Sequence, residues 1–252
     1  MEFSTEVALF LFFVAMIAGW VDSIAGGGGL LTIPSMLLVG MPPAMALATN
    51  KLQSSAGTLT AAIYFMQKGA VNLEQIKCLV LATFIGSMLG SWLVLQIDAS
   101  VLLAYMPVLL ILVGLYFLFS PNIGDVERKR KLSLTAFAIV ICPLLGFYDG
   151  FIGPGTGSFM ALSFVLFCGY SLSKATANAK VLNFTSNVSA LLYFMVFGEV
   201  FWLMGLVMIA GQLIGAFFGA KMALEKGSAL IRPIVVIVCF VMSANILFKQ
   251  FS

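Results

Sequence analysis

Apolar stretches long enough to cross a lipid bilayer follow one another along nearly the whole chain. A membrane-spanning helix needs about 20 mostly apolar residues. Such stretches lie at 7–25, 44–66, 77–97, 101–120, 133–152, 175–197, 201–223 and 230–249, with shorter ones at 29–40 and 158–169. Only 9% of the 252 residues are charged, whereas soluble domains carry about 25%. The sequence therefore predicts an all-α polytopic membrane protein with almost no soluble part.

The composition also excludes several classes of function. The chain has no histidine, and its four cysteines lie in apolar stretches without paired spacing, so we expect no metal site, no cofactor, no His-based catalytic triad and no enzyme. The net charge of +3 comes largely from one loop, which gives no support to nucleic-acid binding. The first apolar stretch follows Glu2 and Glu6 instead of a basic region, so we expect it to be a membrane element and not a cleaved signal peptide.

The second half of the chain repeats the first. LATNKLQSSAGTLTAAIYFM at 47–66 aligns with TANAKVLNFTSNVSALLYFM at 176–195 and pairs Lys51 with Lys180. Upstream, GWVDSIAGGGG aligns with GFYDGFIGPGTG and pairs Asp22 with Asp149. The sequence thus predicts two membrane repeats, 1–124 and 125–252, which together form one integral membrane domain.

Basic residues predict opposite orientations for the two repeats. The loop 125–131 holds the densest basic cluster between two spans and should be cytoplasmic. In the first repeat the connector 67–77 is basic and the next, around Asp98, is not; in the second repeat the connector around Glu199 has no base and the following one is basic. This reversal is typical of inverted-topology repeats, which need an odd number of crossings each.

We therefore expect each repeat to be a glycine-broken re-entrant helix pair followed by three transmembrane helices, with both termini outside the cytoplasm. The alternative is one long kinked helix over 29–66 and eight ordinary transmembrane helices. Separately, Gly211, Gly215 and Gly219 recur at four-residue spacing, which predicts close helix packing, either within one protomer or between protomers of an oligomer.

The glycine-rich breaks predict an anion site. Irregular backbone at membrane depth is tolerated only where it is buried in protein or lines a wet cavity. After the breaks, at Gly26 to Gly29 and at Gly153 to Gly157, short apolar segments begin, and the first amides of a helix lack acceptors within it. Two such helix starts direct free N–H groups and partial positive charge toward the middle of the protein.

Each charged residue near the glycine-rich breaks has two possible roles. Lys51 and Lys180 could bind substrate or line its pathway, because charges within spans usually face a cavity or a partner; alternatively they reach toward the nearest surface or form salt bridges with the equivalent aspartates. Asp22 and Asp149 could cap the amides of the glycine turns, or they could titrate and couple transport to protons. The repeat alone does not decide between these readings.

The same residues carry a family resemblance. GWVDSIAGGGGLLTIPSMLLVGMPPAMALATNKLQ, its partner GFYDGFIGPGTGSF and the following ANAKVLN resemble the TauE/SafE sulfite exporter family, most of all its YfcA-like branch. The resemblance covers nearly the whole chain, including GQLIGAFFGAKMALEKGSALIRPIVVIVCFVMSA. It implies a multi-pass transporter of the plasma membrane, the bacterial inner membrane, for sulfur-containing anions such as sulfite, thiosulfate or sulfonates. In the second repeat, the family's Asn-Lys element reads Asn178-Ala179-Lys180.

We accordingly expect a secondary transporter that moves a small anion, a sulfur-containing oxyanion or sulfonate, by alternating access among membrane lipids. A passive anion channel and a non-transporting membrane scaffold are the alternatives. The candidate substrate-binding residues are Gly26, Gly27, Gly28, Gly29, Asn50, Lys51, Gln53, Gly155, Thr156, Gly157, Ser158, Asn178, Lys180 and Asn183.

Overall fold

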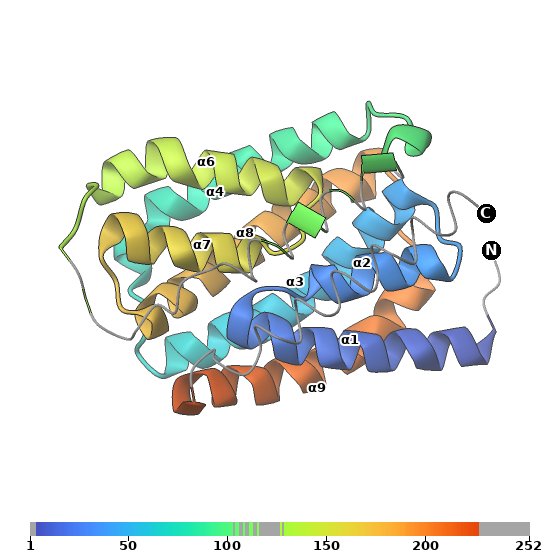
Figure 1. Ribbon diagram of the computed structural model, residues 1–252, viewed down its shortest axis with the longest axis horizontal. Helices are drawn as coiled ribbons and strands as arrows, with labels where there is room; N and C mark the ends of the chain where they lie inside the picture. Colours follow the sequence, from blue (N-terminus) through green and yellow to red (C-terminus); the bar gives the residue numbers. More distant parts are fainter. Residues whose placement is uncertain are drawn as a thin grey trace.

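Long helices dominate the structure, a computed structural model that describes residues 4–102, 104–105, 108, 111–112, 115, 127 and 129–226 (Figure 1). The long helices are α1 (Thr5–Ala25), α3 (Pro43–Gln67), α4 (Leu73–Val94), α6 (Leu134–Phe151), α8 (Leu172–Phe197) and α9 (Trp202–Lys226). All of them except α3 are long and apolar enough to cross a membrane. Within the described ranges the fold has no strand, and the predicted all-α membrane protein is confirmed.

The predicted spans match these helices to within a few residues. The polar composition of α3 has a clear origin, because five consecutive positions include Asn50, Lys51, Gln53 and Ser54, and all four side chains are buried inside the protein. Of the expected span 101–120 only scattered positions are described, and the expected span 230–249 lies outside the described residues.

Two short helices follow the glycine-rich breaks. Helix α2 (Gly29–Leu38) follows α1, and α7 (Thr156–Ser163) follows α6 and continues into a π-helical turn, η1 (Phe164–Cys168). Helix α2 is separate from α3, because Gly40 adopts φ 89° and Pro42 is extended, with ψ 143°, as expected for a residue that precedes a proline. The alternative of one long kinked helix over 29–66 is therefore wrong.

Each short helix turns back toward the end of the molecule from which the preceding long helix came (Figure 1). In that view α1 runs from right to left and α2 returns to the right, whereas α6 runs from left to right and α7 returns to the left. Helices α1 and α6, which occupy equivalent positions in the two halves, thus run in opposite directions. The two break regions lie between them.

The fourth described helix of each half of the chain packs against the other half. Helix α9 of the second half packs along α1, and α4 of the first half packs along α6. Glycines permit both contacts: a Cβ on Gly215 would lie 1.8 Å from the carbonyl oxygen of Met16, and one on Gly150 would lie 1.9 Å from that of Ser87. Close backbone approach of this kind is how small residues join membrane helices. The glycines of α9 thus pack against α1 of the same protomer, which is the close helix packing that their spacing predicted.

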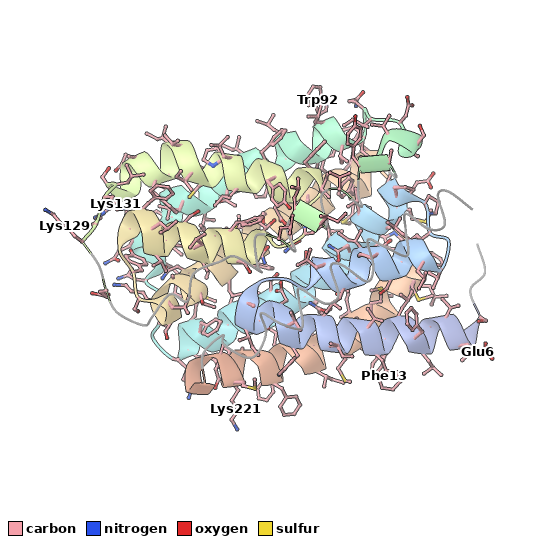
Figure 2. The ribbon with its side chains drawn as sticks, in the orientation of Figure 1. Glu6, Phe13, Trp92, Lys129, Lys131 and Lys221 are labelled. Atoms are coloured by element: carbon pink, nitrogen blue, oxygen red, sulfur yellow. The ribbon has the colours of Figure 1, made fainter. Side chains whose placement is uncertain are left out.

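The outer surface and the two ends differ in chemistry. Large apolar side chains face outward, including Ile139 and Leu203, which are 70% and 69% exposed, and Figure 2 shows Phe13 and Trp92 projecting from the bundle. Lipid would cover such a surface. Lys129 and Lys131 lie at the end of the molecule opposite Glu6 (Figure 2).

Candidate functional site

The two breaks touch each other at the centre of the bundle. Helix α1 ends where Gly26 adopts φ 77° and donates its N–H to the carbonyl of Asp22 at 2.7 Å. A Cβ on Gly26 would lie only 2.3 Å from the backbone carbon of Gly157, so only glycine fits there. The hydroxyl of Ser158 donates to the carbonyl of Ala25. Residues more than 120 positions apart thus form one central site, as the aligned breaks predicted.

The short helices that begin at this site differ in their first turn from four of the long helices, although α3, which begins after Pro42, also has no side-chain cap. Helices α1, α4, α6 and α8 are each capped by a serine or asparagine side chain, namely Ser4, Asn72, Ser133 and Ser171. Helices α2 and α7 start after Gly28 and Gly155, and neither has a side-chain cap. Several of their first amides donate to carbonyls of the glycine turns, such as Leu30 to Gly27 at 3.1 Å and Ser158 to Gly155 at 3.0 Å. What these helix starts offer another partner is therefore mainly their partial positive charge.

Two buried ion pairs connect the halves reciprocally. The ammonium of Lys51 on α3 lies 3.0 Å from Oδ1 of Asp149 on α6, and the ammonium of Lys180 on α8 lies 2.9 Å from Oδ2 of Asp22 on α1. Each lysine also donates to the backbone carbonyl of its aspartate. Both lysines are only 1% exposed, so neither reaches toward a surface, and the salt bridges that the sequence offered as an alternative are formed.

These pairs leave the site without formal net charge, since two ammonium groups face two carboxylates. Removing either partner would leave a buried charge without compensation. Partial positive charge at the site then comes from the starts of α2 and α7. The lysines are available to a bound anion only if it competes with the aspartates. Their role in substrate binding stays a prediction.

In the first half, an amide cluster holds Asn50 in one orientation. Its Oδ1 accepts hydrogen bonds from the hydroxyl of Thr32 at 2.6 Å, from Nε2 of Gln53 at 2.8 Å and from the hydroxyl of Ser54 at 3.4 Å. A Cβ on Gly29 would lie 3.7 Å from Nδ2 of Asn50. The amide donor of Asn50 is therefore held beside the first residue of α2.

The second half builds a similar arrangement from different positions. Oδ1 of Asn183 accepts from Nδ2 of Asn187 at 3.2 Å, and a Cβ on Gly157 would lie 3.0 Å from Nδ2 of Asn183. An amide donor thus also stands beside the start of α7. Asn178 is not part of this group, because its Nδ2 donates to the carbonyl of Lys174, one turn earlier on α8.

The structure brings most of the predicted residues to one place. Contacts connect the glycine breaks, Thr156, Ser158, Asn50, Lys51, Gln53, Lys180 and Asn183 around the centre, whereas the hydrogen bond of the Asn178 side chain goes to Lys174 of its own helix. Sequence reasoning missed Thr32 and Asn187. Both could have been found from helical spacing, since Asn187 follows Asn183 by one turn and Thr32 lies in the first turn of α2.

Comparisons with known proteins agree on one family. Residues 11–246 match the family model described as "Sulfite exporter TauE/SafE". The chain is 49% identical over 250 residues to a "Probable membrane transporter protein" of Haemophilus influenzae, covering 99% of this chain and 98% of that protein. It is 52% identical over 240 residues to the "Probable membrane transporter protein YfcA" of Escherichia coli K12, covering 95% and 89%. A "Probable membrane transporter protein ORF9" of Sinorhizobium sp. is 45% identical over 246 residues, covering 98% and 94%.

The matched range contains both glycine breaks, both ion pairs and both amide clusters. The part of the chain that the structure describes has five apolar helices of spanning length, as expected for a multi-pass membrane protein. The chain belongs to the sulfite exporter TauE/SafE family.

Proposed function

We propose that the chain is a secondary transporter that carries a small anion, a sulfur oxyanion or a sulfonate, across the bacterial inner membrane. The observation that carries this proposal is the meeting of two short helices, each without a side-chain cap, at the buried contact of Gly26 with Gly157. The names of the relatives, which call them probable membrane transporters, support the same class of function.

The chemistry of the site suits an oxyanion. Each helix start contributes about half a positive charge, and the amide groups of Asn50 and Asn183 stand beside those starts. Oxyanions bind well to several N–H donors at once, and charged donors strengthen the binding. Lys51 and Lys180 would provide such donors when an anion displaces Asp149 and Asp22.

Alternating access would move two four-helix bodies against each other. One body contains α1, α2, α3 and α9, and the other contains α6, α7, α8 and α4, since α9 packs on α1 and α4 packs on α6. The opposite directions of α1 and α6 (Figure 1) support an inverted repeat, the arrangement in which such rocking exposes a central site to each side in turn. Both ion pairs connect one body to the other.

We further propose that the end with Lys129 and Lys131 is cytoplasmic, with both chain termini on the opposite side. Basic residues favour cytoplasmic loops, and Glu6 lies at the end of the molecule away from these lysines (Figure 2). Arg128 of the same cluster and Arg232 lie outside the described residues.

Ligand-dependent thermal stabilisation of the purified protein tests the anion site. Sulfite, thiosulfate, methanesulfonate, sulfate and chloride are added in turn, and the unfolding midpoint is read in detergent. A ligand present at 100 times its Kd should stabilise the folded state by about 2.7 kcal/mol. We expect stabilisation by at least one sulfur anion and none in Lys180→Met. No stabilisation by any member of the panel would contradict the proposed substrate class.

A further inference from the structure

The aspartates of the two ion pairs have different surroundings. Both carboxylate oxygens of Asp22 accept hydrogen bonds, Oδ1 from the amide of Gly28 at 3.2 Å and Oδ2 from Lys180 at 2.9 Å. Asp149 uses only Oδ1, which faces Lys51 at 3.0 Å. Its Oδ2 is buried, and no described residue donates a hydrogen bond to it. The pseudo-equivalent carboxylates are therefore not equally satisfied as anions.

The difference in hydrogen bonding between Asp22 and Asp149 arises from the glycine turns that follow them. Gly28 and Gly155 both follow their aspartate by six residues, but Gly28 has φ −57° and ψ −40°, whereas Gly155 has φ 81° and ψ 2°. The two turns therefore present their amides in different directions. In addition, Pro154 stands before Gly155 and has no N–H to donate. The second turn does not offer Asp149 the donor that the first turn offers Asp22.

A buried carboxylate oxygen without a donor carries the full free-energy cost of its lost hydration. Protonation removes the charge that makes this cost large. We infer that Asp149 takes up the proton of the transport cycle, whereas Asp22 keeps its contacts with Gly28 and Lys180; this assignment rests on the proposed function of anion transport. Both oxygens of Asp22 are already engaged, so a proton there would displace an existing contact.

One transport cycle with this proton returns the site to its starting charges. A proton from the water on one side of the membrane forms an O–H bond at Oδ2 of Asp149, and the carboxyl becomes neutral. Lys51 keeps its proton and loses its counterion, so it is free to donate to an anion. The anion and the proton then cross together. On the other side the proton leaves, Asp149 pairs with Lys51 again, and the anion is released.

Among the titratable groups on α6 and on the described elements packed around it, Asp149 is the buried carboxyl with an oxygen that lacks a donor, whereas Glu74 of α4 is exposed. Lys51 is the group that forms an ion pair with Asp149, and Lys180 is paired with Asp22. Helix α7 carries no titratable side chain. The others on the described elements that contact α6, and on α6 itself, are Glu74, Lys77 and Cys78 of α4, Lys174 and Tyr193 of α8, Cys168 of η1, and Cys142 and Tyr148 of α6.

Infrared difference spectroscopy tests the proton site without requiring a known substrate. On acidification, a carboxylic acid formed in a buried place gives a carbonyl band that shifts in heavy water. We expect this band in the wild type, in Asp22→Asn and in the exposed control Glu74→Gln, and we expect its loss in Asp149→Asn. The band's survival in Asp149→Asn, or its loss in Asp22→Asn instead, would overturn the assignment.

Anion transport driven by a pH gradient tests whether the proton on Asp149 crosses the membrane together with the anion. Proteoliposomes with the membrane potential clamped at zero receive labelled methanesulfonate, a monovalent anion, with acid outside. Carriage with one proton should accumulate the anion about tenfold for each pH unit, because one pH unit is a tenfold ratio of proton activity. Asp149→Asn should abolish the accumulation, and Glu74→Gln should not change it.

The outcomes separate the two proposals. Wild-type flux of methanesulfonate or thiosulfate that ignores the pH gradient would overturn the proton assignment and leave anion transport intact. Absence of flux with every anion would overturn the proposed function, while the infrared band would still report on Asp149. If Asp149→Asn does not fold, the double variant Lys51→Met with Asp149→Asn, which removes both charges of the pair, replaces it in the infrared experiment.

Discussion

Lys51→Met should abolish anion transport and lower the free energy of unfolding by about 3–5 kcal/mol. The ammonium of Lys51 lies 3.0 Å from Asp149 and is 1% exposed, so its removal leaves a buried carboxylate without a counterion. The double variant Lys51→Met with Asp149→Asn should regain most of the lost stability, because neither charge remains. It should not regain transport, because the donor to the anion is still absent.

An exposed lysine provides the matched control. Lys77 forms a surface ion pair with Glu74 at 3.1 Å, and its side chain is 71% exposed, so Lys77→Met should change stability by about 0.5 kcal/mol or less. Unfolding in detergent and anion flux in proteoliposomes are measured for all three variants. Full transport by the double variant would show that the pair only holds the fold together and would remove Lys51 from the site.

Gly215→Ala should separate α1 from α9 and strongly reduce the amount of folded protein. A Cβ at this position would lie 1.8 Å from the carbonyl oxygen of Met16 and 2.9 Å from the amide nitrogen of Trp20. Both are backbone atoms, which cannot turn away as a side chain can. Alanine improves helix propensity by about 1 kcal/mol, but overpacking costs typically about 1–3 kcal/mol and more against rigid backbone. The backbone clash should therefore outweigh the gain in helix propensity, so that Gly215→Ala lowers the free energy of unfolding.

Gly40→Ala separates this clash from a simple effect of replacing glycine. Gly40 has φ 89°, but a Cβ there would meet no atom within 4 Å, so the substitution should cost only the left-handed backbone, about 1–2 kcal/mol. Size-exclusion chromatography after graded heating gives the folded fraction of each variant. Gly215→Ala that is as stable as the wild type would mean that α1 and α9 do not touch as described.

Much of the fold was predictable because membrane spans depend on length and apolarity. The stretch 133–152 became α6 and 201–223 became α9 to within a few residues. The glycine breaks also identified α2 and α7, because four glycines or a Gly-Pro-Gly run cannot continue a helix cheaply. The exchange of α4 and α9 between the halves was not predictable from one sequence, since it depends on which backbones approach across the chain.

The candidate site was predictable in its residues but not in its pairing. The aligned repeats identified Lys51, Lys180, Asp22 and Asp149, and a salt bridge between equivalent groups was one reading of them. The sequence could not show that each lysine pairs with the aspartate of the other half, because that requires the crossing of α1 with α8 and of α3 with α6. It also could not show that Asn178 donates to Lys174 whereas Asn183 accepts from Asn187, because both asparagines lie on α8 and only the structure distinguishes their partners.

Counterflow in proteoliposomes tests the central claim most directly. Vesicles that contain the wild-type protein are loaded with unlabelled methanesulfonate or thiosulfate and diluted into a trace of the labelled anion. A carrier with one central site exposed to each side in turn should accumulate the label transiently above its equilibrium level, and Lys180→Met should not. Label that only follows the membrane potential without exchange would identify a channel, and no uptake of any anion would contradict the account.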